Sequence, residues 1–346
     1  MVRVPNWVGD AVMAVPALRE LRRVFNAAHV TLVARPSVAE LFDGEGLADD
    51  LIEVSGERGR AERARQFFGE ARRLRRARFD MAVLLTNSFA SALAARAGGA
   101  KQIVGYATDA RRFLLTQAVA FEPDFKRLHQ ARYYLNIAAQ LEQRLTGERR
   151  VDLDARPTLS VTEAARRQAR RLLEAAGVDT SRRLIALNPG ATNSRAKRWP
   201  PERFAAAADQ LSVSDGFAAF IVGAHGDRDV ASAVAGNMRA GVADLTGRTT
   251  LAELKAVLAC AALVVSNDTG TAHVAAALGV PTVTVFGPTE HFATRPLADL
   301  AQVVRHPVEC SPCMLRDCPI DHRCMTRVEV ADVYQAAHNL LARAAR

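Results

Sequence analysis

Short runs of apolar and β-branched residues alternate along the whole chain with longer segments of helical periodicity. The pattern runs through the first half, stops at a polar segment with Gly and Pro at 146–161, and then starts again. Such alternation is typical of strands joined by crossover helices, which form parallel sheets covered on both faces. The sequence therefore predicts an α/β protein with two doubly wound, Rossmann-like domains that face each other across a cleft.

The same pattern predicts the individual elements. The expected strands are 29–34, 51–55, 80–86 and 102–106 in the first half, and 184–187, 218–222, 263–266 and 282–286 in the second, with one very short strand before residue 6. The expected helices are 10–25, 58–78, 88–96, 126–145, 163–176, 201–211, 227–238, 251–259, 271–278 and 328–346.

The charge of the chain favours anionic partners. The formal net charge is +9, and 42 of the 46 basic residues are arginine, which favours nucleic acid, an acidic membrane surface or a phosphorylated substrate. Zinc-finger spacings, RNP-like aromatics and basic heptads are all missing, so nucleic acid is disfavoured and an anionic lipid or saccharide surface is the better interpretation. The densest run, 58–78, holds nine arginines at spacings that suit an amphipathic helix, for which a solvated face is the simpler interpretation.

The chain carries no sign of membrane insertion or secretion. Its apolar runs are shorter than the ~18 residues needed to cross a bilayer, and Asp10 interrupts what would be the apolar core of a signal peptide. We therefore expect a cytoplasmic protein.

A carboxylate stands where the first strand passes into the first helix. Asp10 ends the segment Asn6-Trp7-Val8-Gly9-Asp10, which matches neither a dinucleotide fingerprint nor a phosphate loop with its lysine. One interpretation is a general base at the mouth of a cleft, which accepts a proton from a hydroxyl group. The other is a helix cap.

Two polar segments of the second half follow predicted strands. The loop 188–200 contains Thr192 and Lys197, one of only four lysines in the chain, and its hydroxyl and cationic groups suit a phosphate. A solvated basic loop is the alternative. The turn 266–273 opens a helix with Asp268, Thr269 and Gly270, so free backbone N–H groups and the helix dipole favour a diphosphate there. His273 is either part of this site or a structural histidine.

Four late cysteines form a C-x2-C-x4-C-x5-C pattern. Cys310, Cys313, Cys318 and Cys324, with His322 among them, have the ligand types of a structural zinc site. A loop of reduced thiols is the favoured alternative, because the later spacings are uncommon for zinc.

Five segments together resemble one family. PNWVGDAVMAVPAL, GYATDARRFLLT, NPGATNSRAKRWPPERF, SNDTGTAHVAAALGVPTVTVFGPTE and CSPCMLRDCPIDHRCM are similar, in this order, to segments of the ADP-heptose:lipopolysaccharide heptosyltransferases of glycosyltransferase family 9, and most to its type II members. The resemblance covers almost the whole chain.

The resemblance implies a GT-B fold with an acceptor-binding domain at 1–155, a nucleotide-sugar domain at 156–327 and a final helix, 328–346, that packs back on the N-terminal domain. It implies an inverting, metal-independent enzyme without cofactor, peripheral on the cytoplasmic face of the inner membrane. Heptose would pass from ADP-L-glycero-D-manno-heptose to the first heptose of the Kdo–lipid A core. Asp10 falls on the general base. The donor-binding residues implied are Thr192, Lys197, Asp268, Thr269, Gly270 and His273.

The candidates for contacts with the acceptor are chosen by their charge and by their position in the first half of the chain. Asn6, Arg111 and Arg112 are candidates in the first half, and the two arginines suit a phosphate or a Kdo carboxylate, with a surface pair as the alternative. Two other functions share the predicted architecture: a nucleotide-sugar 2-epimerase, and a non-catalytic protein that binds enzymes of lipopolysaccharide assembly. The epimerase would need acid and base residues around the sugar ring, whereas Asp10 is the one clear candidate in the sequence.

Overall fold

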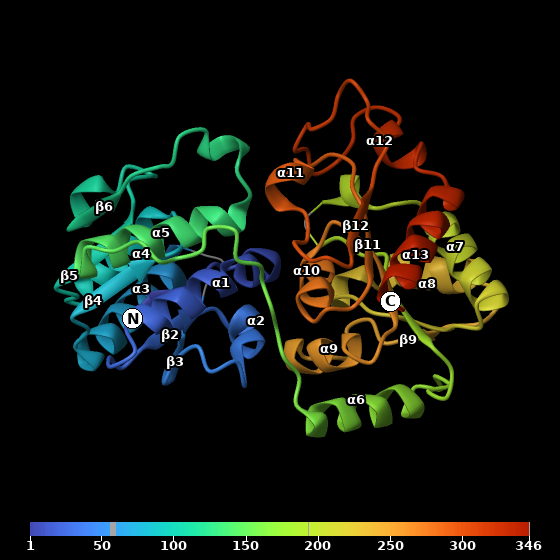
Figure 1. Cartoon of the computed structure of the whole chain (residues 1–346), viewed down its shortest axis with the longest axis horizontal. Helices are drawn as coiled ribbons and strands as arrows, with labels where there is room; N and C mark the ends of the chain where they lie inside the picture. Colours follow the sequence, from blue (N-terminus) through green and yellow to red (C-terminus); the bar gives the residue numbers. More distant parts are fainter. Residues whose placement is uncertain (56–59, 193, 346) are drawn as a thin grey trace. The chain divides into compact units, whose positions relative to one another are not determined.

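The computed structural model describes residues 1–55, 60–192 and 194–345. The chain divides into two compact units, Met1–Pro157 and Thr158–Arg346, each built around its own sheet (Figure 1). The division falls two residues beyond the boundary that we expected from the polar linker.

The first unit contains a six-stranded parallel sheet with the order β3-β2-β1-β4-β5-β6. Its strands are β1 (Val2–Arg3), β2 (Thr31–Ala34), β3 (Asp50–Glu53), β4 (Met81–Leu84), β5 (Gln102–Tyr106) and β6 (Gln117–Val119). The four strands expected from apolar runs are all present, and the strand before residue 6 is as short as expected.

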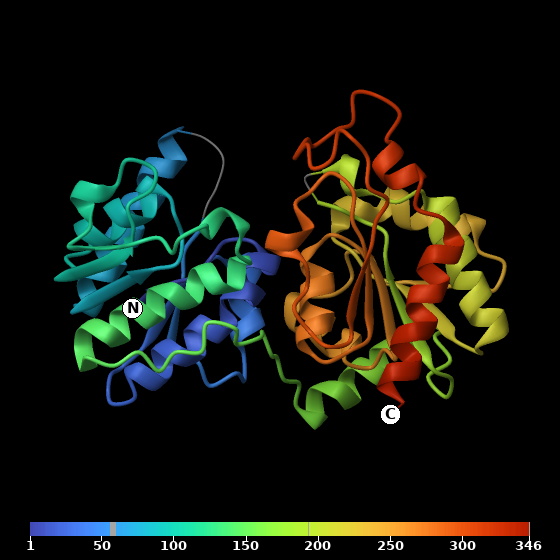
Figure 2. The ribbon, with the colours of Figure 1, turned by 45° about the horizontal axis from the view of Figure 1, so that its top comes forward.

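Two helix pairs cover this sheet. α1 (Val8–Val24) packs along α5 (Gln130–Thr146), while α3 (Arg60–Ala77) packs against α4 (Phe89–Ala97). Figures 1 and 2 show the pairs on opposite faces of the sheet, the arrangement of a doubly wound fold. The short helix α2 (Pro36–Ala39) and 3₁₀ turns at Glu40–Phe42, Arg112–Leu114 and Phe125–Arg127 complete the unit.

The second unit repeats the plan with the order β12-β11-β10-β7-β8-β9, again all parallel. Its strands are β7 (Leu184–Asn188), β8 (Ala218–Ile221), β9 (Ala243–Asp244), β10 (Leu263–Asn267), β11 (Thr282–Val285) and β12 (Ala301–Val304). Every residue of β7, β8, β10 and β11 is buried. Parallel strands covered on both faces need such continuous apolar runs, which is why the sequence revealed these four.

Helices again form two layers. α7 (Pro201–Ser214) packs with α8 (Arg228–Asn237) and α13 (Val330–Ala344), and α9 (Leu251–Leu258) packs with α6 (Glu163–Ala175) and α10 (Gly270–Ala277). The short helices α11 (His291–Thr294) and α12 (Arg323–Thr326), and 3₁₀ turns at Arg195–Lys197 and His225–Asp227, lie between them in sequence.

The final helix corrects one expectation. We expected 328–346 to pack back on the N-terminal domain, but α13 belongs to the second unit and packs on α7, β11 and β12. Its apolar side chains Val333, Ala337 and Leu340 are completely buried in the core of that unit. The amphipathic pattern of the helix is therefore explained by local packing.

Three strands were not expected. β6, β9 and β12 lie at sheet edges, contain two to four residues, and are partly exposed. An edge strand needs fewer apolar residues than a central one, so its sequence signal is weak. Among the described residues, no helix is both long enough and apolar enough to cross a membrane.

Candidate functional site

The candidate residues of both units follow the carboxyl ends of central strands. In each sheet the strand order reverses beside the first strand of the unit, between β1 and β4 and between β7 and β10. Open parallel sheets bind ligands at such a point, because the two loops leave in opposite directions. Asp10 follows β1, Lys197 lies in the loop after β7, and Asp268 follows β10.

The structure brings Lys197 and Asp268 together. The Nζ atom of Lys197 lies 2.8 Å from Oδ2 of Asp268, whose residue is only 6% exposed. The hydroxyl group of Thr289, in the loop after β11, donates to the same carboxylate oxygen at 2.7 Å. Three loops on neighbouring strands thus converge on one ion pair, in which the ammonium group keeps partial access to solvent.

The adjoining helix start has no side-chain cap. Thr269 is the N-cap of α10, but it makes no capping hydrogen bond. Its hydroxyl group instead accepts a hydrogen bond from the Asn188 amide at 2.7 Å. The first N–H groups of α10 therefore donate no hydrogen bond to the Thr269 side chain, and a helix start of this kind favours an anion.

Buried polar residues that the sequence analysis missed hold the Lys197 loop in place. Asn267, completely buried, accepts a hydrogen bond from the backbone N–H of Trp199 and donates to the carbonyl of Pro189. Asp227 accepts from the backbone N–H of Ala191 and from Arg198. The signal in the sequence was a polar residue ending a continuous apolar strand, as at Asn267.

Gly190 lets Asp227 approach this loop. A Cβ atom at Gly190 would lie 2.3 Å from Cγ of Asp227, so another residue there would displace the carboxylate. Asp227 is 4% exposed and positions the loop through Oδ1, while its Oδ2 accepts from the backbone N–H of Ala224.

The remaining donor-site candidates differ in accessibility. Thr192 is exposed on the loop after β7, and the described part of the chain resumes beyond it at Ser194. His273, on the first turn of α10, is only 5% exposed and has a partner within the protein. Its burial favours the structural interpretation over direct contact with a ligand.

The segment 310–324, which contains the four late cysteines, makes hydrogen bonds and an ion pair to the turn that carries Lys197. His322 and the carbonyl of Ala196 are hydrogen-bonded at 2.6 Å, and the N–H of Ala196 donates to the carbonyl of Arg316 at 2.9 Å. Arg195 and Asp317 form an ion pair at 2.7 Å. The residue next to Lys197 is thus tied to this segment through both of its backbone polar groups.

The four cysteines are free thiols that line one small cavity of about 80 Å³. Burial, and then the three neighbouring cysteines, raise the pKa of Cys324 to about 11, which keeps its thiol protonated at neutral pH. Within the described residues, His, Cys, Asp and Glu form no group of three or more that could hold a metal ion.

Asp10 lies in the first turn of α1, where a buried tyrosine contacts it. The hydroxyl group of Tyr134 on α5 donates to Oδ1 of Asp10 at 3.4 Å. Burial, and then the charge of Asp10, raise the pKa of Tyr134 well above its ordinary value, so this hydroxyl group remains a neutral donor. Asp10 as a residue is only partly buried.

Of the other two acceptor candidates, Arg112 is exposed, whereas the side-chain oxygen of Asn6 is buried. Oδ1 of Asn6, at the end of the β1 segment, is buried and has no hydrogen-bond partner in the structure. Arg112 is exposed in the 3₁₀ turn after β5.

Arg111 corrects a second expectation. Its guanidinium group is completely buried and donates to the carbonyls of Tyr106, at 2.9 Å, and Thr86, at 2.6 Å. Burial lowers its pKa. It therefore joins the carboxyl ends of β4 and β5, and it is not presented to an acceptor.

We expect Arg111→Leu to lower the free energy of unfolding by about 2–3 kcal/mol, because two buried carbonyls would lose their donors. Hydrogen exchange of the β4 and β5 amides would measure this loss within the first unit. Arg112→Leu is the matched control and should change stability by less than about 0.5 kcal/mol. An unchanged exchange pattern in Arg111→Leu, together with a raised KM for an acceptor, would contradict the structural role.

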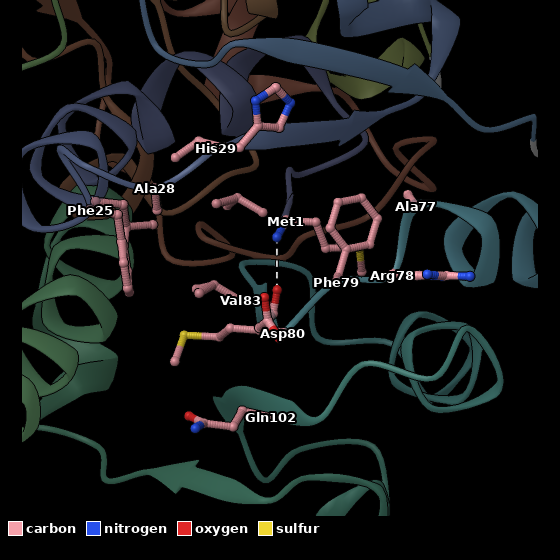
Figure 3. Close-up of a pocket in the computed structure, with 14 residues that line it drawn as sticks. Met1, Phe25, Ala28, His29, Ala77, Arg78, Phe79, Asp80, Val83 and Gln102 are labelled. Carbon is pink, nitrogen blue, oxygen red and sulfur yellow. Dashed lines mark hydrogen bonds between the residues drawn. The ribbon is translucent and has the colours of Figure 1, made fainter.

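A larger cavity lies at the amino ends of the strands of the first sheet, opposite to the end that Asp10 follows. It has a volume of about 420 Å³ and is lined by residues at the amino ends of β1, β4 and β5, including Met1, Asp80 and Gln102 (Figure 3). The amino group of Met1 donates to the carbonyl of Met81 at 2.7 Å, and burial lowers its pKa to about 6. This cavity is at the wrong end of the strands to include Asp10.

A family model decides between the functions left open by the sequence. The model of glycosyltransferase family 9 (heptosyltransferase) matches residues 69–323, which is most of the chain. The chain belongs to glycosyltransferase family 9. The epimerase is therefore not favoured, and neither is a protein without enzymatic activity.

Individual relatives agree with the family. This glycosyltransferase is 29% identical to lipopolysaccharide heptosyltransferase 2 of Salmonella typhimurium, over 87% of this chain and 86% of the relative. It matches a solved structure of the E. coli ADP-heptose lps heptosyltransferase II with a TM-score of 0.82 and 24% identity, over 100% and 99% of the two chains. A family 9 structure from Veillonella parvula matches with a TM-score of 0.84, 24% identity and coverage of 99% and 96%. The expected GT-B fold class is thus confirmed.

Proposed function

We propose that this family 9 enzyme transfers heptose from ADP-heptose to the first heptose of a Kdo–lipid A core at the cytoplasmic face of the inner membrane. The observation that carries the proposal is the match to heptosyltransferase 2 relatives along 87% of the chain. The donor named for the solved relative is ADP-heptose. The Lys197 ammonium group beside the uncapped start of α10 suits the diphosphate of such a donor.

The second unit supplies the donor contacts. Lys197 and the N–H groups of α10 would bind the diphosphate, while the Asp268 carboxylate and the Thr289 hydroxyl group hold the lysine in position. As the bond between the anomeric carbon and the phosphate oxygen breaks, its electron pair moves to the departing ADP. A fixed cation and preorganised N–H groups stabilise the charge that develops there.

The first unit supplies the base. The acceptor hydroxyl oxygen attacks the anomeric carbon from the face opposite to ADP, and its proton passes to Asp10. Tyr134, which donates to Asp10, holds the carboxylate in place. The exposed Arg112 is a candidate for an anionic group of the acceptor, and Asn6 stays a candidate for a contact near Asp10. The configuration at the anomeric carbon is inverted by this single displacement.

ADP release by the purified chain tests the proposal. We expect release with heptosylated Kdo–lipid A and little with the unheptosylated acceptor. Preference for the unheptosylated acceptor would identify a first-heptose transferase instead. Conversion of ADP-heptose to an epimer or free sugar would favour an isomerase, and complete lack of turnover with both acceptors would contradict the enzymatic role.

We expect turnover to persist in EDTA, because Lys197 and the α10 N–H groups can neutralise the diphosphate in place of a divalent cation. The measurement is ADP release before and after dialysis against the chelator. Rapid loss of turnover that magnesium restores would contradict this mechanism. Slow loss of stability alone, restored by zinc, would instead indicate metal at the four cysteines.

A further inference from the structure

The outer face of α3 carries an array of arginines around one exposed aromatic ring. The array consists of five residues that share one face of the helix, because each lies three or four residues from another member: Arg65, Phe68, Arg72, Arg75 and Arg76. All five are exposed, and Phe68 is exposed by 69%. The array spans about 16 Å along the helix axis at the usual rise per residue.

The inner face of α3 is anchored independently of this array. Leu74 is 1% exposed and packs with Val33 of β2, Val54 just after β3 and Ala94 of α4. The Glu70 carboxylate is turned inward to Arg3 at 2.6 Å, where both side chains are nearly buried. The outer face can therefore be changed without removing core contacts.

Among the described side chains of α3 (Ala64–Ala77), Arg72, Arg75 and Arg76 have no carboxylate partner, whereas Arg65 interacts within the protein. The one carboxylate in this part of α3, Glu70, is taken by Arg3. Within the described residues, Arg72, Arg75 and Arg76 form no hydrogen bond or ion pair through their side chains. A helix face of this kind is attracted to anionic headgroups, and an aromatic ring in its middle adds apolar burial at the interface.

We propose that the outer face of α3 docks the enzyme on an anionic bilayer surface, with the arginines at the headgroups and Phe68 inserted between them. The inference rests on the proposed function for the choice of a bilayer, because a lipid-linked acceptor lies in one. RNA is the other polyanion that arginines bind. Single-stranded nucleic acid is usually held by several stacking aromatic residues, whereas this face offers one.

Binding to vesicles tests the proposal without any turnover. The probes are vesicles of phosphatidylethanolamine with phosphatidylglycerol, and vesicles of phosphatidylcholine alone. We expect the whole chain to co-sediment with the anionic vesicles only. Replacing Arg72, Arg75 and Arg76 together by Gln should weaken this binding on the order of 100-fold, at about fivefold for each basic residue near the surface.

A second helix offers a matched control. Replacing the exposed Arg167, Arg170 and Arg171 of α6 by Gln removes the same charge from the other unit. This variant should bind the vesicles within about fivefold of the parent chain, since at most one contact of the usual strength would change. Phe68→Ser should weaken binding roughly tenfold with the net charge unchanged. Circular dichroism should show all three variants folded.

Three results would overturn the proposal. The parent chain could fail to bind anionic vesicles, or the α3 and α6 variants could lose vesicle binding equally. The third is that the chain binds RNA more tightly than vesicles and that the α3 variant loses binding to RNA only. Turnover separates this proposal from the proposed function. The α3 variant should retain full activity on detergent-dispersed acceptor and lose activity on vesicle-embedded acceptor. If the parent chain turns over neither, the proposed function fails, while the vesicle-binding experiment still decides the docking face.

Discussion

Replacing Asp10 by Asn should lower kcat by a factor on the order of 10²–10⁴, the usual range for loss of a general base. The amide keeps the shape of the side chain and can still accept a hydrogen bond from Tyr134, so α1 and its contact with α5 should remain. It cannot accept the proton of an acceptor hydroxyl group. The affinity for ADP, measured by calorimetry, should not change, because the donor contacts lie in the other unit.

Glu20→Gln is the matched control for this experiment. Glu20 lies on the same helix and pairs with Arg23 at the protein surface, so its replacement removes one carboxylate from α1 without touching Asp10. Its kcat should match that of the unchanged enzyme, since exposed pairs contribute under about 1 kcal/mol to stability and nothing to the proposed proton transfer. Near-normal turnover in Asp10→Asn would remove Asp10 from the mechanism.

Lys197→Ala should weaken binding of ADP-heptose and slow the chemical step, the latter by roughly 10²–10³, the measured cost of one lost donor to a developing oxyanion. Two physical effects add. The cation proposed to stabilise the departing diphosphate is lost. The nearly buried carboxylate of Asp268 also loses its cationic partner, so its negative charge is left unpaired next to the proposed diphosphate site. Because charge on the phosphate grows as the bond breaks, the effect on kcat should exceed the effect on affinity.

Lys197→Arg should recover only part of this loss. A planar guanidinium group cannot occupy the position of a compact ammonium group 2.8 Å from Asp268 without moving the turn. Arg195→Ala is the control within the same turn, since Arg195 is largely exposed and pairs with Asp317. It should change kcat by less than about threefold. Wild-type values for both Lys197 variants in steady-state kinetics would exclude Lys197 from the site.

The arginine-rich helix α3 shows which features of an amphipathic pattern can be predicted from sequence. The arginine-rich run was expected to form a helix with one apolar side, and Leu74 and Ala71 form that side in the structure. The first residues of the predicted helix, 58 and 59, lie outside the described residues. Leu74 is buried as an amphipathic helix requires, whereas Phe68, one of the apolar residues between the charges, is 69% exposed.

The pattern of apolar and polar residues along the chain was enough to predict the architecture and the end of the strands at which the candidate site lies. Continuous apolar runs such as β7 and β10 exist because both faces of a parallel strand are covered, and that requirement can be recognised in one dimension. A polar residue directly after such a run must lie at the carboxyl edge of the sheet. Asp268 is such a residue, whereas Asp10 and Lys197 lie farther along the loops after β1 and β7, and the resemblance to family 9 implied the roles of all three.

Tertiary structure decided what each polar group faces. Arg111 and Arg112 are neighbours in sequence with the same chemistry, yet one is buried against backbone carbonyls and the other is exposed. Asp227, Tyr134 and His322 contact the site from elements 30 or more residues away in sequence, at pairings that no periodicity encodes. The final helix likewise packs on its own unit. The sequence by itself determined which residues stand at the ends of strands, because that depends on local patterns; partners and burial depend on long-range packing, which only the folded chain decides.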